Sequence, residues 1–271
     1  MHDLNTIEAL AQRLAMTPSD LVSLAERAPV LYRWWKKPKK SGKGMRTIES
    51  PDPALMKVQR LLLDLVLMSV SVPDTMFGSK GRGTIQAARR HVRKPLVVVM
   101  DIADFFPSIS IRQVIDALVR SGAQRDVAKF LARLMTFDGH LATGAPTSTR
   151  MAMIVAAPAL IDIQKALSTI PNADLSIWVD DTTISGPIGL KRMLPTIRRI
   201  FSRHGLKVHP EKQKEMPRTQ EQVTLGIKVN DRIALPESYR LKFDREGAIL
   251  PPLHPKRRGM ERYMEALEKA Y

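Results

Sequence analysis

The chain has 271 residues, 44% of them hydrophobic, which is enough for one large domain or for two to three smaller lobes. Lysine and arginine number 43 against 27 acidic residues, and the net charge of +16 favours a polyanionic partner, nucleic acid ahead of an anionic membrane surface. The lack of cysteine excludes disulfides, iron–sulfur clusters and thiolate zinc sites. No apolar run reaches the ~20 residues of a membrane span and the N-terminus does not resemble a signal peptide, so we expect a cytoplasmic protein with no membrane partner.

Helices are predicted at the start of the chain. Two short helices are expected over 6–14 and 18–27, because Thr17-Pro18 is a helix cap followed by proline at the first helical position. The basic stretch 32–53, interrupted by glycine and proline, is typical of a loop or hairpin. Apolar residues at helical spacing then predict a helix over 55–70.

The rest of the chain alternates strands and helices, which predicts an α+β or α/β core with helical flanks. The expected elements are a short helix over 84–91, a buried strand over 95–102, helices over 110–121 and 125–136, a helix containing Pro158, a hairpin over 175–185, a helix over 188–204, a second hairpin over 222–235 that bends at Asn230-Asp231, and a short terminal helix.

Three acidic residues stand at predicted strand ends. Asp101 closes the strand over 95–102, and Asp180 and Asp181 lie at the bend of the hairpin LSIWVDDTTIS (175–185). If those strands are neighbours, the three carboxylates converge and repel one another unless cations neutralise them. Mg²⁺ prefers oxygen ligands, and a pair of such ions supports nucleotidyl transfer. The alternative for any lone Asp-Asp pair is a solvated turn.

Six sequence blocks resemble those of bacterial reverse transcriptases, and the chain is most similar to the retron group. In order they are GKGMRTIESP (42–51), MDIADFFPSI (100–109), LATGAPTSTRMA (141–152), WVDD (178–181), GLKVHPEK (205–212) and VTLG (223–226). The resemblance covers roughly residues 20–235. It implies an α+β right-hand polymerase fold whose antiparallel palm sheet packs on helices. The implied divisions are an N-terminal helical segment (1–38), fingers (39–95 and 111–140), a palm (96–110 and 141–230) and a reduced thumb or basic C-terminal segment (231–271).

The resemblance also implies a catalytic centre. Asp101, Asp180 and Asp181 match the acids that hold two Mg²⁺ ions, and the carbonyl of Ile102 is a further expected ligand. Lys212 matches a lysine that protonates the leaving pyrophosphate.

Five residues match the pocket for the deoxynucleoside triphosphate. Lys43 and Arg46 are expected to grip its phosphates. Phe106 would clash with a ribose 2′-hydroxyl and so select deoxynucleotides. Thr143 and Gly144 stand in a block where the family has Pro-Gln-Gly, and Thr143 is shorter than the usual glutamine.

Other positions bear on the primer and on membership of the retron group. Leu225-Gly226 matches the turn that supports the primer end, and Trp178 replaces the usual tyrosine before the acids. Ala87 stands where retron enzymes have asparagine, four residues before His91, and we expect His91 to be packed rather than functional.

These observations predict an RNA-directed DNA polymerase that copies a dedicated, structured noncoding RNA into DNA. The resemblance places it in retron-type defence against phage, with an accessory effector protein as a further partner. The alternatives are a non-retron defence or group II intron-like reverse transcriptase, a catalytically idle RNA-binding scaffold, and a nucleotide cyclase or two-metal nuclease.

Overall fold

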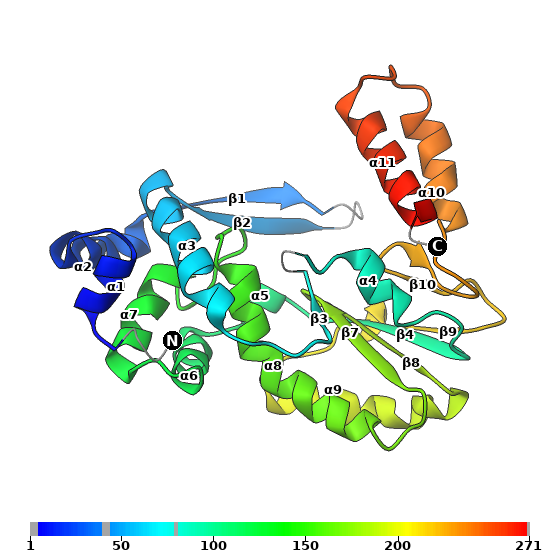
Figure 1. The fold of residues 1–271 in the computed structure, drawn as a ribbon, viewed down its shortest axis with the longest axis horizontal. Helices are drawn as coiled ribbons and strands as arrows, with labels where there is room; N and C mark the ends of the chain where they lie inside the picture. The colour runs from blue at the N-terminus through cyan, green and yellow to red at the C-terminus, as the bar shows by residue number, and fades with distance from the viewer. Residues whose placement is uncertain (1–4, 40–43, 79–80, 270–271) are drawn as a thin grey trace. The chain divides into compact units, whose positions relative to one another are not determined.

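A computed structural model describes residues 5–39, 44–78 and 81–269 (Figure 1). Lys43 therefore lies outside the described residues. The chain divides into two compact units. Unit 1 comprises Met1–Pro73, Ala103–Ala159 and Arg203–Leu206, and unit 2 comprises Asp74–Ile102, Leu160–Ser202 and Lys207–Tyr271. The predicted boundaries of fingers, palm and thumb stay predictions.

Unit 1 is mainly helical. Its N-terminal elements are α1 (Ile7–Arg13), α2 (Pro18–Arg27), the 3-10 turn η1 (Ala28–Val30), β1 (Tyr32–Pro38), β2 (Met45–Pro51), α3 (Pro53–Leu65) and η2 (Leu67–Ser69). Its central elements are α5 (Phe105–Ser108), α6 (Ile111–Arg120), α7 (Arg125–Met135), β5 (Thr136–Phe137), β6 (His140–Leu141) and the first part of α8 (Ser148–Leu167).

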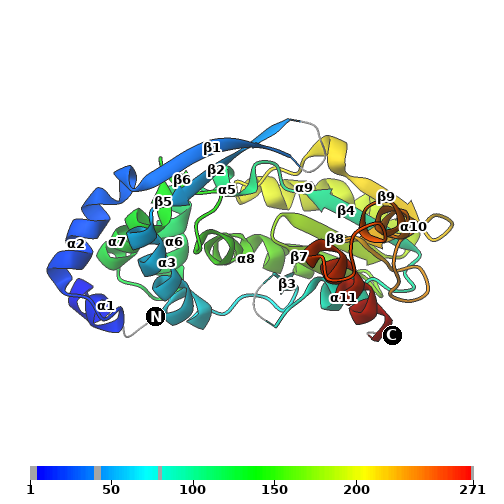
Figure 2. The same ribbon diagram turned by 90° about the horizontal axis from the view of Figure 1, so that it is seen from above.

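Side-chain caps fix the starts of several of these helices. Thr17 accepts a hydrogen bond from the amide of Asp20 and is followed by proline at the first helical position, as predicted. Asp52 caps α3, and Ser110 forms a reciprocal capping box with Gln113 at the start of α6. Within the stretch 32–53, predicted as a loop or hairpin, strands β1 and β2 pair antiparallel as the two arms of a long hairpin (Figure 2).

Unit 2 is built on one five-stranded sheet with the strand order β3-β7-β8-β4-β9. These strands are Met76–Phe77, Asp174–Trp178, Asp181–Gly186, Leu96–Asp101 and Lys214–Pro217. All neighbours pair antiparallel except β3 with β7. Strand β4 contributes Leu96, Val97, Val98 and Met100 to the hydrophobic core, and all four are fully buried.

The remaining elements of unit 2 cover the sheet or follow it. They are α4 (Thr84–Arg89), the rest of α8, η3 (Ile188–Met193), α9 (Leu194–Arg203), η4 (Pro210–Lys212), β10 (Val223–Thr224), β11 (Ile227–Lys228), α10 (Glu237–Lys242), the π-turn η5 (Phe243–Gly247) and α11 (Pro255–Lys269). Figure 1 shows α4 on one side of the strands and α9 on the other. Ala88, Val97, Met216, Ile227 and Leu267 form one apolar cluster that joins α4, the sheet, β11 and α11.

The second predicted hairpin bends earlier than expected. Strands β10 and β11 pair Val223 with Lys228 and Thr224 with Ile227, so the tight turn is Leu225-Gly226. Both turn residues have positive φ, 52° and 75°, which suits the twist of a two-residue hairpin loop. The chain also turns back around Asn230-Asp231, where an isolated bridge joins Lys228 to Ala234. The predicted bend is thus the second of two.

Of the helices in the described part of the chain, none combines the length and the apolar character that crossing a bilayer requires.

Candidate active site

The three predicted acids meet at one corner of the unit 2 sheet. Strand β4 ends at Asp101 and β8 begins at Asp181, and the two residues are direct partners in the antiparallel ladder. Asp180 lies in the turn between β7 and β8, and its carbonyl accepts a hydrogen bond of 3.1 Å from the amide of Ile102. The tight turn requires Val179 at a φ of 58°, a left-handed conformation that is rare for a β-branched residue. Residues about 80 positions apart in sequence are therefore neighbours.

Negative charge is crowded at this corner. Burial, followed by the charges of Asp180 and Asp101, raises the pKa of Asp181 to about 6, against the opposing effect of Lys212. A carboxyl group in this setting gains from any cation that enters the corner.

Lys212 already supplies one positive charge. Its Nζ lies 2.7 Å from Oδ2 of Asp101. The segment that carries it runs along the end of β4, because Val208 forms an isolated bridge with Ile102 and the amide of His209 donates a 2.7 Å hydrogen bond to the carbonyl of Asp101. Asp101, Ile102, Asp180, Asp181 and Lys212 thus form one cluster within unit 2, which we call the acidic corner.

The acidic corner is not a ready-made coordination sphere. Among the residues that the structure describes, no group of three or more His, Asp or Glu side chains is arranged to hold a metal ion. The assignment of metal ligands therefore stays a prediction.

The turn β10–β11 is tied to the same sheet. The hydroxyls of Thr183 on β8 and Thr224 on β10 are 2.6 Å apart and buried. This contact fixes the turn Leu225-Gly226 to β8, the strand that starts at Asp181. The role of the turn in supporting a primer stays a prediction.

The described residues of the predicted nucleotide pocket belong to unit 1. Arg46 lies exposed on β2, and Thr143-Gly144 packs against the same strand. The amide of Glu49 donates a 2.9 Å hydrogen bond to the carbonyl of Thr143, and the amide of Thr143 donates a 3.1 Å bond to the Glu49 carboxylate. Gly144 has a φ of 133°, and a Cβ at this position would lie 3.0 Å from the carbonyl oxygen of Glu49. Glycine is therefore required there for both conformation and space.

Phe106 also belongs to unit 1. It is half-buried on the short helix α5, with its ring centroid 5.5 Å from that of Phe105. This placement leaves part of the ring accessible, as contact with a substrate needs.

Glu49 makes buried polar contacts that the sequence does not indicate. Glu49 is buried, and in addition to Thr143 it contacts His140, whose Nε2 lies 3.2 Å from both carboxylate oxygens. The only sequence signal for Glu49 is an acid in an otherwise basic hairpin.

His91 is fully buried between the hydroxyls of Ser176 and Ser185, each 2.7 Å from a ring nitrogen. Burial lowers its pKa to about 3, with further contributions from Lys94 and Arg90. These contacts show that His91 is packed, as predicted.

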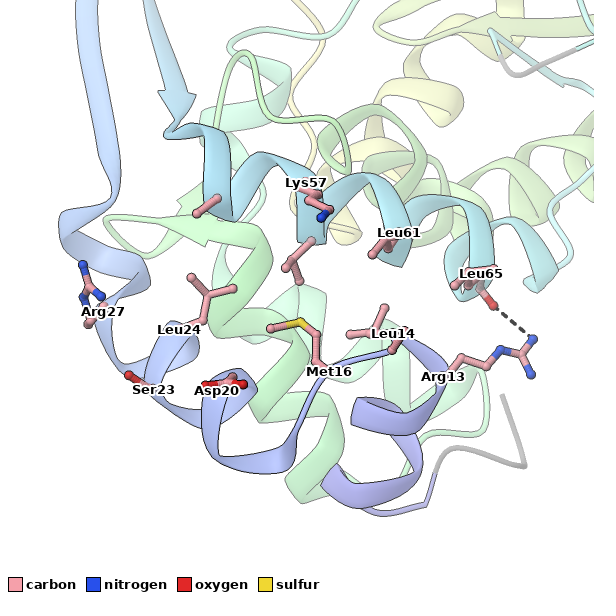
Figure 3. Close-up of a pocket in the computed structure, with 13 residues that line it drawn as sticks. Arg13, Leu14, Met16, Asp20, Ser23, Leu24, Arg27, Lys57, Leu61 and Leu65 are labelled. Atoms are coloured by element: carbon pink, nitrogen blue, oxygen red, sulfur yellow. Dashed lines mark hydrogen bonds between the residues drawn. The ribbon is translucent and has the colours of Figure 1, made fainter.

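Unit 1 also contains a cavity of about 590 Å³ that includes none of the predicted site residues (Figure 3). Leu14 and Met16 line it from the connection between α1 and α2, Leu24 lines it from α2 and Leu61 from α3. The Arg13 side chain at its edge donates to the carbonyl of Leu65. Asp20 is the one acidic lining residue, so this cavity lacks the charge pattern of the acidic corner.

Residues 37–229 match the family model of the reverse transcriptase (RNA-dependent DNA polymerase). This span includes the acidic corner, the end of β1 and all of β2. The chain belongs to the reverse transcriptase family.

The curated relatives include three retron reverse transcriptases. The chain is 27% identical to the Retron Mx162 enzyme and 29% identical to the Retron Mx65 enzyme, both of Myxococcus xanthus, and 25% identical to the Retron Ec86 enzyme of Escherichia coli. The matches cover 98%, 75% and 82% of this chain and 62%, 52% and 70% of the respective relatives. The chain thus spans between half and two thirds of the length of the two Myxococcus enzymes. The resemblance to bacterial reverse transcriptases of the retron group is confirmed.

Solved telomerase structures share the fold. The apo telomerase of Candida tropicalis, truncated from its C-terminal domain, matches 82% of this chain and 61% of its own at a TM-score of 0.57 and 12% identity. Telomerase of Candida albicans, in complex with a fragment of telomeric RNA, matches 92% of this chain and 56% of its own at a TM-score of 0.54 and 10% identity. At these identities the likeness concerns the fold alone, and it confirms the predicted polymerase fold with mixed helices and strands.

Proposed function

We propose that this chain is an RNA-directed DNA polymerase that copies a structured noncoding RNA by two-metal nucleotidyl transfer. The observation that carries the proposal is the direct pairing of Asp101 with Asp181 beside Asp180. Family membership supports it, because polymerases of this family act on nucleic acid, as does the net charge of +16.

The acidic corner fits Mg²⁺ by its chemistry. Its donors would be the carboxylates of Asp101, Asp180 and Asp181 and the carbonyl of Ile102, all hard oxygen ligands of the kind that Mg²⁺ prefers. The raised pKa of Asp181 reflects the excess of negative charge that such cations would neutralise. When bound, magnesium would activate the primer hydroxyl and stabilise the charge on the leaving pyrophosphate.

Other residues of the chain would bind the nucleotide, select its sugar and assist the leaving group. Lys212, held on the acidic corner by Asp101, is available to place a positive charge and a proton beside the leaving group. Arg46 would bind the phosphates of the deoxynucleoside triphosphate, with Lys43 as its predicted companion. Thr143-Gly144 would line the nucleotide pocket, and the ring of Phe106 would exclude a 2′-hydroxyl.

The biological setting we propose is a retron-type anti-phage system. It rests on the retron relatives, and it makes a dedicated RNA the template and an accessory effector protein a further partner. The departure at Ala87 favours a second candidate within the same family, a non-retron or intron-like enzyme.

The test is RNA-templated incorporation of deoxynucleotides by the double variant Asp180→Asn/Asp181→Asn. We expect loss of incorporation with RNA binding retained, because the substitution removes two charged metal ligands and no basic residue. Asp126→Asn is a matched control, since the Asp126 side chain is 94% exposed on α7. Unchanged incorporation by the double variant would overturn the proposal, and RNA binding by the wild type without any incorporation would favour the idle scaffold.

A further inference from the structure

The β1–β2 hairpin, which we call the ribbon, exposes two adjacent tryptophans. Trp34 is 64% exposed and Trp35 is 47% exposed. A large aromatic side chain left in water forgoes most of its burial energy, and exposed aromatic surface of this kind marks binding sites. The sequence motifs assigned to the polymerase do not include either residue.

The strand register places the two rings on opposite faces of the ribbon. Directly opposed residues of an antiparallel pair share a face, and successive residues alternate between faces. Trp35 is opposite Ile48, and two residues further along Lys37 is opposite Arg46. Trp34 is opposite Glu49, on the other face.

The two faces differ in charge. The face of Trp35 carries Arg33, Lys37 and Arg46, all exposed, and no acidic residue among its paired positions. The face of Trp34 carries Lys36 and the buried carboxylate of Glu49. One face therefore combines an exposed flat ring with three cations.

We propose that Trp35, Arg33 and Lys37, on the face that also carries Arg46, form a stacking platform for an unpaired base of single-stranded nucleic acid. Base stacking on an aromatic ring and contact of flanking phosphates with lysine and arginine are the two features of single-strand binding surfaces. An apolar protein partner would leave the three cations without counter-charges. The proposal deepens the proposed function, on which it rests, because an unpaired template strand is the ligand that such a polymerase must hold.

The chain allows a direct spectroscopic test, because it has only three tryptophans, Trp34, Trp35 and Trp178. The variant Trp34→Phe/Trp178→Phe retains Trp35 as its single fluorophore, and Trp35→Phe/Trp178→Phe retains Trp34. On titration with a short single-stranded RNA, we expect stacking to quench the fluorescence of Trp35 and to leave that of Trp34 nearly unchanged. An abasic oligonucleotide of the same length keeps the phosphates but removes the bases, and it should quench neither.

Affinity gives a second measurement. Trp35→Ala should weaken binding of the same RNA by about 5- to 150-fold, the range of one lost base–aromatic stack. Trp35→Phe, which keeps a ring, should recover part of the loss. Trp34→Ala is the matched control, with the same chemistry at the adjacent position, and should bind as the wild type does once circular dichroism has confirmed its fold.

Three results would overturn the platform: equal quenching of both tryptophans, quenching by the abasic strand, or equal loss of affinity in Trp34→Ala and Trp35→Ala. The same variants are assayed for RNA-templated incorporation. If the wild type incorporates deoxynucleotides but RNA does not quench Trp35, the platform is rejected and the proposed polymerase activity is retained. Quenching of Trp35 without any incorporation by the wild type rejects the proposed polymerase and retains the single-strand site.

Discussion

His91 should make a large and pH-dependent contribution to the stability of unit 2. Its ring joins the turn after α4 to β7 and β8 through the hydroxyls of Ser176 and Ser185, both 2.7 Å away. Replacing it by alanine removes two buried hydrogen bonds, leaves both hydroxyls without this partner and opens a cavity. Each lost bond costs about 1 kcal/mol, and the unsatisfied groups and the cavity add to that. We expect His91→Ala to lower the free energy of unfolding by about 3 kcal/mol at pH 8.

The pH dependence follows from the lowered pKa of His91. Its folded value is about 3, whereas the ordinary value is 6.5, so the unfolded chain takes up a proton below pH 6.5 that the folded chain does not. The stability that His91 contributes is therefore complete above pH 6.5 and falls by about 1.4 kcal/mol for each pH unit below it, until pH reaches the folded pKa. At pH 5 the loss amounts to about 2 kcal/mol.

The assay compares the wild type with His91→Asn, which keeps polar atoms but does not titrate. Both are prepared with Trp34→Phe and Trp35→Phe, so that Trp178 on β7 alone reports the urea unfolding of unit 2. Asp181, whose pKa is raised, changes stability in the opposite direction, but it is present in both proteins and cancels in their difference. The difference in unfolding free energy should shift by about 2 kcal/mol between pH 8 and pH 5. Parallel pH profiles would refute the reasoning, because they would mean that His91 is not held neutral.

Further predictions concern the acidic corner and the nucleotide pocket. Lys212→Ala should raise the pKa of Asp181 beyond about 6 in metal-free protein, since the ammonium group now lowers it; carboxyl-carbon NMR measures this, and an unchanged value would contradict the contact. Gly144→Ala should lower the free energy of unfolding of unit 1 by about 2 kcal/mol, because the alanine would combine a strained φ with a close contact to the backbone of Glu49. Gly189→Ala, at a glycine with open space around it, should have little effect. Phe106→Ala should admit ribonucleotides in single-nucleotide extension, and unaltered discrimination would mean that Phe106 is not the gate.

The acidic corner could be predicted because its signals are local. The apolar run over 95–102 and the alternation around Asp180 and Asp181 each indicate a strand with acids at its end, and the structure places β4 at Leu96–Asp101 and starts β8 at Asp181. Their adjacency is a matter of topology, which the family resemblance supplied and the residues alone did not.

Features that depend on distant contacts could not be predicted. The Asn230-Asp231 pair is a stronger local turn signal than Leu225-Gly226, since leucine rarely adopts positive φ. The earlier turn is stabilised by a distant contact, in which the hydroxyl of Thr224 is hydrogen-bonded to that of Thr183 on β8. Likewise, the buried contacts of Glu49 involve residues far away in the sequence, such as Thr143, which is 94 residues away.

The most direct test of the account is divalent-cation binding at the acidic corner, measured by Mn²⁺ paramagnetic resonance on the metal-free protein. Mn²⁺ serves as a spectroscopic substitute for Mg²⁺, because both take oxygen ligands. We predict that the wild type and Asp126→Asn bind the ion with equal affinity, and that Asp101→Asn and Asp181→Asn each weaken binding at least about tenfold. Wild-type affinity in Asp101→Asn would contradict the claim that these strand-end carboxylates form one metal site.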